Sequence, residues 1–182
     1  AAFSIDLDSF KDINDVFGHA VGDLLLIEVA GRMREILRPG EFLARQSGDE
    51  FLGLQMSGNH PSDAQAFAER IAAVLATPFR VHDHIITLTA SIGYSIFPID
   101  SPEREQVLSN AKLAMHRGKS KQRGLICRYQ REMDDQARAR RALARDLQTA
   151  AQNEELVLFY QLQTSLADGA ICGAEALMRW KH

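Results

Sequence analysis

The sequence predicts an α+β domain with a mainly antiparallel sheet, followed by a linker helix and a short second unit. Strand-like and helical segments alternate in the order β-α-α-β-β-α-β-β-α-β over residues 1–130, which mixes hairpins with crossing helices. The composition then changes over 131–152, where Arg alternates with Ala and Leu and neither Pro nor Gly occurs. Two more strand-like runs follow. We therefore expect three segments, at 1–130, 131–152 and 153–182.

Each element has its own sequence pattern. The strand-like runs are short and apolar, and they occupy residues 1–7, 41–46, 51–56, 79–82, 85–97, 125–129, 156–163 and 170–178. The helical segments are expected at 9–17, 23–37, 62–76, 103–117 and 131–152. Gly18 and Gly22 break the pattern before the second helix, and Pro39-Gly40 ends that helix. The sequence Ser47-Gly48-Asp49-Glu50 has the composition of a tight turn and predicts a hairpin.

The bulk composition excludes several classes of protein. The chain has 21 Lys and Arg against 24 Asp and Glu, a formal net charge of -3, which argues against nucleic-acid binding and against membrane contact by this segment. Cys127 and Cys172 lack metal-type spacing, and they indicate ordinary thiols in a reducing cytosol. No apolar run approaches the roughly 20 residues that span a bilayer. We expect a cytoplasmic segment, and a parent anchored to the membrane through another region stays compatible with it.

Acidic residues gather at two predicted chain reversals. Asp6 and Asp8 flank Leu7 at the end of a strand, so their side chains point to the same face. Asp49 and Glu50 lie in the predicted hairpin turn. If the strands are neighbours, these carboxylates converge and suit Mg²⁺, which favours phosphoryl or nucleotidyl transfer. The alternative is that exposed turn acids are simply solvated.

Two basic residues favour the transfer chemistry. Lys119 and Arg123 are four residues apart near the end of a predicted helix, on one face. In this position they can reach the oxygens of a triphosphate. The alternative is a solvated basic end of a helix.

These residues form the motifs of a known family. The run Asp6-Leu7-Asp8-Ser9-Phe10-Lys11-Asp12-Ile13-Asn14-Asp15, with Gly18-His19 and Gly22-Asp23 after it, resembles the DxDxFKxIND…GH…GD signature of GGDEF diguanylate cyclases. The loop Arg45-Gln46-Ser47-Gly48-Asp49-Glu50-Phe51 resembles their RxGGDEF loop, and Ser91-Ile92-Gly93-Tyr94 their SIG strand. The resemblance covers residues 1 to about 130 and implies a polymerase-palm-like sheet flanked by helices. It also implies the condensation of two GTP molecules into cyclic-di-GMP with release of pyrophosphate.

The resemblance assigns roles by position. It implies that Asp6, the Leu7 carbonyl and Asp49 bind Mg²⁺ or Mn²⁺, and that Glu50 assists deprotonation of the 3′-hydroxyl or orients the nucleotide. The residues implied to bind substrate or stabilise phosphate charge are Lys11, Asn14, His19, Asp23, Lys119 and Arg123. Of these, Asn14 and Asp23 would read the guanine edge, because a wrong base leaves their polar groups unpaired.

The chain departs from the family pattern at several positions. Ser47 replaces the first Gly of the loop, which would cost about 1 kcal/mol if the backbone there needs a positive φ. Lys112, His116, Gln122 and Gly124 depart from the usual AD.ALY.AK..GRN helix and turn, and the helix before the first strand is missing. The inhibitory-site pattern RxxD is present as Arg38-Pro39-Gly40-Glu41, with a longer acidic arm.

A second signature follows the linker. The segments Leu158-Phe159-Tyr160-Gln161 and Gly173-Ala174-Glu175-Ala176-Leu177-Met178-Arg179-Trp180 resemble the YQP…GAEALLRW opening of EAL phosphodiesterases, with Leu162 in place of Pro. The resemblance implies that Glu175 is a metal ligand, that Arg179 contacts a dinucleotide phosphate and that Gln161 lines a substrate groove. An ordinary ion pair between Glu175 and Arg179 is the alternative. Only the opening hairpin of the family's β/α barrel would be present.

Two functions remain open at this point. The first is a diguanylate cyclase that acts as a transient homodimer, since each site holds one GTP, in a parent that also carries a phosphodiesterase domain. The second is a catalytically weak GGDEF domain that binds GTP and regulates that phosphodiesterase. In both cases GTP and cyclic-di-GMP are the expected ligands.

Overall fold

The computed structural model describes residues 1–56 and 60–181, apart from the side chains of residues 136 and 137. The chain divides into two units, Ala1–Asp134 and Asp135–His182. Within the described ranges, no helix is both long and apolar enough to cross a membrane.

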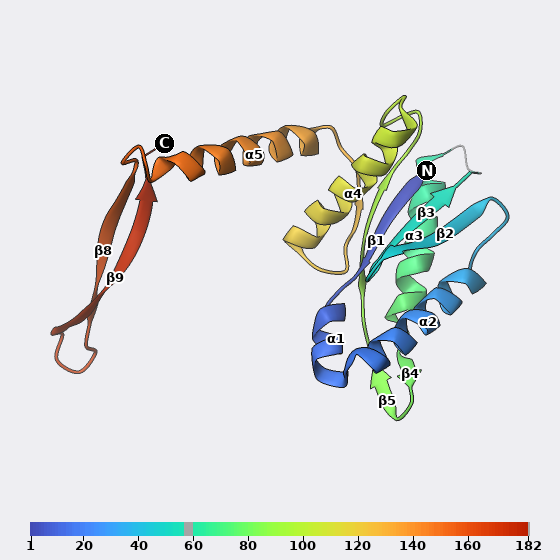
Figure 1. Ribbon diagram of the computed structural model, residues 1–182, viewed down its shortest axis with the longest axis horizontal. Coiled ribbons are helices and arrows are strands. Elements are labelled where there is room, and N and C mark those ends of the chain that lie inside the picture. Colours follow the sequence, from blue (N-terminus) through green and yellow to red (C-terminus); the bar gives the residue numbers. More distant parts are fainter. Residues whose placement is uncertain (57–59, 182) are drawn as a thin grey trace. The chain divides into compact units, whose positions relative to one another are not determined.

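The first unit is built on a five-stranded sheet with the order β2-β3-β1-β6-β7 (Figure 1). Its strands are β1 (Ala2–Leu7), β2 (Glu41–Ser47), β3 (Glu50–Gln55), β6 (Ala90–Ser95) and β7 (Ile126–Arg128). The central strand β1 pairs antiparallel with both β3 and β6, and only β7 runs parallel to its neighbour β6. The prediction of a mainly antiparallel α+β domain is therefore confirmed.

Four helices and a small hairpin complete this unit. The helices are α1 (Phe10–Phe17), α2 (His19–Glu35), α3 (Pro61–Ala76) and α4 (Arg104–Lys121). The hairpin pairs β4 (Phe79–Val81) with β5 (His84–Ile86). Figure 1 shows α4 on one face of the sheet and α2 and α3 on the other.

One face of the sheet carries the main apolar core. Phe3, Ile5 and Leu7 alternate along β1 and are fully buried. They belong to one cluster with residues of α2 and α3, and the rings of Phe3 and Phe67 meet edge to face at 4.9 Å. Because the sheet is covered on both faces, every residue of β1 is buried.

The other face is lined with small and polar residues. Ser4 and Asp6 of β1 lie opposite Gly93 and Ser91 of β6, so all four share this face. A Cβ atom at Gly93 would lie only 2.1 Å from the Met115 nitrogen of α4. The missing side chain lets the backbone of α4 approach the sheet closely.

The structure differs from the sequence prediction in three elements, one of which is α4, which runs to Lys121 rather than to 117. The second helix begins at His19 rather than at 23, because Gly18, with φ +85°, ends α1 and starts α2 with no further linker. The single strand predicted over 85–97 is two strands, β5 and β6. The chain turns between them where the Asp8 amide donates to the Thr89 carbonyl at 2.8 Å.

The second unit contains a helix and a hairpin. The helix α5 (Glu132–Ala150) begins within the first unit, where Met133 packs on Ala114 and Tyr129, and most of it belongs to the second unit. Strands β8 (Leu156–Thr164) and β9 (Ile171–Trp180) pair antiparallel, and the Trp180 indole donates to Glu155 at 2.9 Å. The large apolar side chains exposed on this hairpin are Leu158, Phe159, Tyr160, Leu162, Leu166, Ile171 and Met178.

We predict that Gly93→Ala destabilises the protein. The new Cβ would meet the α4 backbone at Met115 and Ala111, which cannot move away as a flexible side chain can. Overpacking of this kind costs about 1–3 kcal/mol. Gly31→Ala is the matched control, because nothing lies within 4 Å of its Cβ position in α2, and it should stabilise by about 0.5–1 kcal/mol. Urea denaturation of both variants measures the difference, and a neutral Gly93→Ala would contradict close contact between α4 and the sheet.

Candidate functional site

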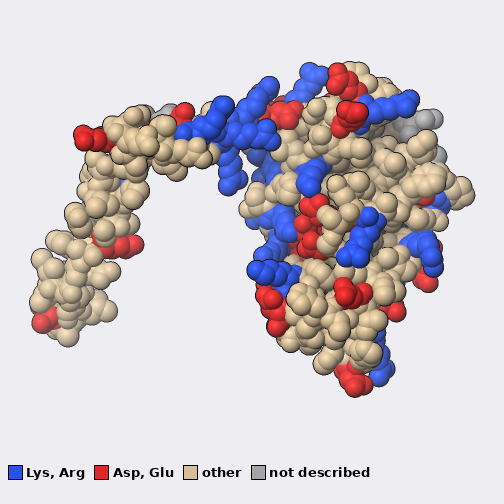
Figure 2. All heavy atoms as spheres, viewed as in Figure 1, with Lys and Arg blue, Asp and Glu red and all other residues tan. Residues whose placement is uncertain are grey.

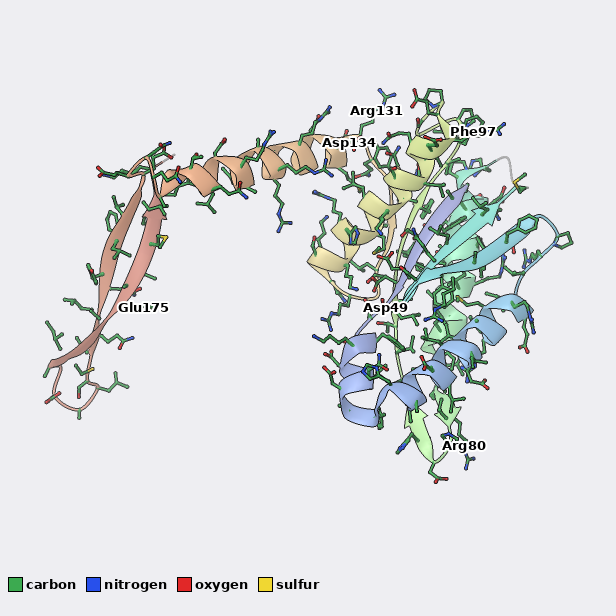
Figure 3. All side chains as sticks on the ribbon, viewed as in Figure 1. Asp49, Arg80, Phe97, Arg131, Asp134 and Glu175 are labelled. Carbon is green, nitrogen blue, oxygen red and sulfur yellow. The ribbon has the colours of Figure 1, made fainter. Side chains whose placement is uncertain are left out.

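The acidic residues of the first signature meet at the end of the central strand. Asp6 of β1 lies directly opposite Glu50 of β3, so both side chains point to the face that α4 covers. The Leu7 amide donates to the Asp49 carbonyl at 3.2 Å, which holds the hairpin turn against the strand end. Figure 3 shows Asp49 at this edge of the sheet, and Figure 2 shows acidic side chains there beside basic ones.

Helix α4 places a lysine on each of two carboxylates. The Lys119 ammonium donates to Asp6, and the Lys112 ammonium lies 2.9 Å from the nearer carboxylate oxygen of Glu50. The two lysines are seven residues apart, which is about two helical turns, so they share one face of the helix. The Asp6 pair is the more enclosed, because its side chains are 10% and 30% exposed.

Asp6 has a perturbed pKa. Burial raises the pKa of its carboxyl above the ordinary value, and the Lys119 ammonium opposes this shift through a hydrogen bond and its charge. The neighbouring carboxylates of Asp49 and Asp8 raise the pKa further. Burial is therefore the main cause of the raised pKa of Asp6, and the neighbouring carboxylates add to it.

Asp8 has a different environment from Asp6. Its two carboxylate oxygens accept hydrogen bonds from the Thr89 and Ser91 hydroxyls, both at 2.7 Å. Asp8 is buried and ties the end of β1 to β6. These bonds explain its position without any ligand.

The hairpin turn retains the backbone that the glycine signature provides. Gly48 has φ +52°, whereas Ser47 is not among the residues with positive φ and ends strand β2. The Arg45 guanidinium donates to the Gly48 carbonyl at 2.8 Å and braces the turn. The condition for strain at Ser47, a positive φ, is therefore not met, because the left-handed residue is the glycine that the chain keeps.

Helices α1 and α2 bring Asn14 against Gly22. The Asn14 side-chain oxygen is buried without a hydrogen-bond partner in the described part of the chain. A Cβ atom at Gly22 would lie 1.8 Å from this oxygen, so only glycine leaves room for the amide. The other predicted residues of these helices, Lys11, His19 and Asp23, are exposed.

Arg123 lies beyond the end of α4 and closes the site on another side. Its guanidinium donates to the Ser9 hydroxyl and lies 3.9 Å from the Asp12 carboxylate. Ser9 has φ 58°, a left-handed conformation that is uncommon for serine and that turns the chain from β1 into α1. A hollow of about 290 Å³ is lined by Asp8, Ser9, Ala76, Thr87, Leu88, Thr89 and Arg123.

The carboxylate oxygens at the strand end are the type of ligand that a hard divalent cation prefers. Asp6 and Asp49 contribute carboxylates and the buried site concentrates negative charge, which a cation would relieve. Among the described residues, however, no group of three or more His, Cys, Asp or Glu is arranged to hold a metal ion. A cation at Asp6 would therefore rely on oxygen atoms beyond the acidic side chains, and would compete with Lys119.

Glu41, the acidic residue of the inhibitory-site pattern, is bound by other residues of this chain. Glu41 is buried, and its oxygens accept hydrogen bonds from Arg70 at 2.5 and 2.6 Å and from the Arg38 amide at 2.9 Å. Burial raises the pKa of Glu41, but these donors outweigh burial and leave the pKa below its ordinary value. Glu41 is thus held as a carboxylate by Arg70.

The residues of the second signature share one face of the β8–β9 hairpin. Gln161 lies opposite Glu175, and Arg179 pairs with Val157 four residues along the hairpin. All three side chains are exposed, and Figure 3 shows Glu175 on this hairpin.

The sequence reasoning missed the contacts of three residues. In the sequence, Lys112 stands out only as a departure from a motif. Its seven-residue spacing from Lys119, which places both on one face of a helix, is the signal that could have indicated its role. The partnership of Thr89 and Ser91 with Asp8 joins residues more than eighty positions apart. No local pattern indicates such a pairing.

Comparisons with known proteins agree with this geometry. The family model described as "Diguanylate cyclase, GGDEF domain" matches residues 1–125. Two relatives from Pseudomonas aeruginosa are the bifunctional diguanylate cyclase/cyclic di-GMP phosphodiesterase MucR, 38% identical over 182 residues, and the cyclic di-GMP phosphodiesterase NbdA, 36% identical over 183 residues. Each alignment covers 100% of this chain but only 26% and 23% of the relative, so the chain spans about a quarter of their length.

A solved structure supports the same assignment. The GGDEF domain of YfiN, also called TpbB, from Pseudomonas aeruginosa matches with a TM-score of 0.69 and 34% sequence identity. The match covers 71% of this chain and 81% of that one. Fold, motifs and sequence similarity agree, and the chain belongs to the GGDEF domain family of cyclic-di-GMP signalling.

Proposed function

We propose that the first unit is a diguanylate cyclase that condenses two GTP molecules into cyclic-di-GMP and releases two pyrophosphates. The observation that carries the proposal is the pair of carboxylates, Asp6 and Glu50, side by side under α4 with a lysine on each. The two carboxylates can bind a metal ion and accept a proton, and the two lysines can bind phosphate. The name of MucR, a bifunctional relative, supports the same reaction.

The metal-binding role falls to the end of β1 and the hairpin turn. Asp6, the Leu7 carbonyl and Asp49 would hold Mg²⁺ or Mn²⁺. When bound, such a cation neutralises phosphate charge and favours the ionised attacking hydroxyl. Lys119, which now pairs with Asp6, is then free to contact phosphate oxygens.

The remaining residues hold the nucleotide and move its proton. Lys11, Lys119 and Arg123 stabilise the charge on the triphosphate, and Glu50 accepts the proton of the 3′-hydroxyl. His19 assists in substrate binding beside the Gly18 turn. Asn14 and Asp23 read the guanine edge, and the unpartnered oxygen of Asn14 supports this, because a guanine donor would satisfy it.

A regulatory GTP-binding module is the second candidate. The ion pair of Lys112 with Glu50 favours it, because the proposed base is already occupied. The phosphodiesterase NbdA, a relative over the whole chain, is compatible with this role. Ser47 does not favour the regulatory module, because Gly48 provides the left-handed residue of the turn.

We further propose that the second unit opens an EAL phosphodiesterase domain. The proposed partition is a GGDEF domain at 1–130, a linker helix at 131–152 and the EAL opening at 153–182. The exposed apolar side chains of the β8–β9 hairpin support a larger structure around it. Gln161, Glu175 and Arg179 on one hairpin face would contribute substrate and metal contacts there.

The proposed partners follow from the chemistry. Each site binds one GTP, so cyclisation needs two facing copies and a transient two-fold dimer. Cyclic-di-GMP is the product ligand, and we propose neither nucleic-acid binding nor membrane contact for this segment, which we place in the cytoplasm. Because Glu41 is held by Arg70, we expect no strong product feedback through Arg38 and Glu41.

The cyclase proposal is tested by incubating the 182-residue chain with GTP and Mg²⁺ and quantifying cyclic-di-GMP by liquid chromatography. We expect product, with a rate per protomer that rises with protein concentration and levels off as dimers form. Glu50→Gln should nearly abolish the rate, whereas Ser47→Gly should leave it unchanged or higher. GTP binding without product at any concentration would favour the regulatory module instead.

We predict that Gly22→Ala weakens GTP binding. The added Cβ would collide with the Asn14 amide and displace it from its present position. Loss of a buried hydrogen-bonding group costs about 1–3 kcal/mol, or roughly a fivefold to hundredfold loss in affinity. Isothermal titration calorimetry with GTP measures the change, with Gly31→Ala in the same helix as the control. Equal affinities in the two variants would argue against a role for Asn14.

We predict that Asp6→Asn raises the free energy of unfolding at pH 7 while it abolishes Mg²⁺-dependent turnover. The raised pKa of Asp6 means that its ionised form costs stability at neutral pH, and that this cost disappears as the pH falls toward the ordinary value of 3.8. The advantage of the variant should therefore shrink on acidification. Urea denaturation between pH 4 and 7 checks this.

The contrasting variant for this experiment is Asp8→Asn. Its carboxylate accepts two hydroxyl hydrogen bonds, so the substitution should destabilise by about 1–2 kcal/mol at pH 7. If both variants changed the free energy of unfolding in the same direction, Asp6 and Asp8 would not lie in different environments.

A further inference from the structure

Glu50 is held from across the sheet face by one residue of α4. The Lys112 ammonium lies 2.9 Å from one carboxylate oxygen of Glu50 and 3.2 Å from the other. Both oxygens are therefore engaged by the same cation. Because Glu50 begins β3 immediately after the turn, the contact links α4 to the hairpin loop of the site.

This contact is distinct from the neighbouring ion pair. Lys119 engages Asp6 on the central strand, whereas Lys112 engages Glu50 one strand away toward the sheet edge. The Lys112 and Glu50 side chains are 43% and 22% exposed, so solvent and ligands reach them. An ion pair with this exposure contributes little to stability and is readily exchanged. Its position makes it more important for the site than for the fold.

We propose that Lys112 is a positioning residue that acts as an inhibitory clamp on Glu50. The inference rests on the proposed cyclase function. In that reaction the 3′-oxygen forms a bond to the α-phosphorus of the second GTP, the bond to pyrophosphate breaks and Glu50 takes the hydroxyl proton. While Lys112 contacts both oxygens of Glu50, it competes with the hydroxyl for the carboxylate. The clamp must open before each proton transfer.

The clamp would slow a site that keeps its other proposed residues. Lys112 is one of the positions at which the chain departs from the helix pattern of its family. The clamp therefore sets the rate of this chain without removing any residue proposed to bind GTP. It acts on turnover and leaves nucleotide affinity intact.

The test compares Lys112→Met with Lys121→Met, an exposed lysine at the end of the same helix. We expect Lys112→Met to raise kcat for cyclic-di-GMP formation about 1.5-fold to fivefold, the range expected for an ion pair of this exposure. The KM for GTP should stay within about twofold, and Lys121→Met should match the wild type. Lys112→Arg, which keeps the cation, should not show the increase. A fall in kcat in Lys112→Met, or an equal rise in the arginine variant, would overturn the clamp.

A second readout separates the clamp from the cyclase proposal. Removal of the lysine leaves Glu50 unpaired beside Asp6, so Lys112→Met should bind Mn²⁺ about 1.5-fold to fivefold more tightly without nucleotide, as followed by electron paramagnetic resonance. If every variant is inactive but Mn²⁺ affinity rises only in Lys112→Met, the hold of Lys112 on Glu50 is supported, and it is the cyclase proposal that fails. If the wild type is active and neither kcat nor Mn²⁺ affinity differs between Lys112→Met and Lys121→Met, the clamp fails and the cyclase proposal stands.

Discussion

The close approach of α4 to the sheet is the constraint on which the site depends. Gly93 has no side chain, and the backbone of α4 fills the space that a Cβ atom would occupy. This contact sets the height of the helix above β1 and β6. At that height, lysines two turns apart reach the carboxylates on β1 and β3 below. A larger residue at position 93 would move α4 away from the sheet. Both lysines would then move away from their carboxylates.

At this face of the sheet, two lysines offset part of the negative charge of the carboxylates. Asp6 is buried beside other carboxylates, and burial raises its pKa despite the lysine that binds it. A group of this kind is retained at the expense of stability, which is common where residues serve a reaction. Asp8, two residues away, shows the opposite case, since two hydroxyl groups satisfy it and make it part of the framework. Neighbouring acids on one strand end thus have different environments, one paired with a lysine and one bound by two hydroxyl groups.

The second unit has a different physical character. Its hairpin carries large apolar side chains exposed to solvent, and the described residues provide little to cover them. An isolated two-stranded hairpin is at best marginally stable in water, so such a surface calls for further protein. The relatives extend well beyond the aligned region, since this chain spans about a quarter of their length. The first unit, with its own core, needs no such cover.

The sequence by itself determined the fold class, the order of the elements and most of the residues at the strand end. Alternating apolar residues, helix periodicity and turn glycines are local signals, and the acids at Asp6 and Asp49 lie within such signals. Tertiary structure alone decided what those acids contact. The pairing of Lys112 with Glu50, the hydroxyls on Asp8 and the fit of Asn14 against Gly22 depend on strand order and on the height of α4. The backbone at Ser47 was also settled only in three dimensions, because φ depends on the register of the hairpin, which places the left-handed residue at Gly48.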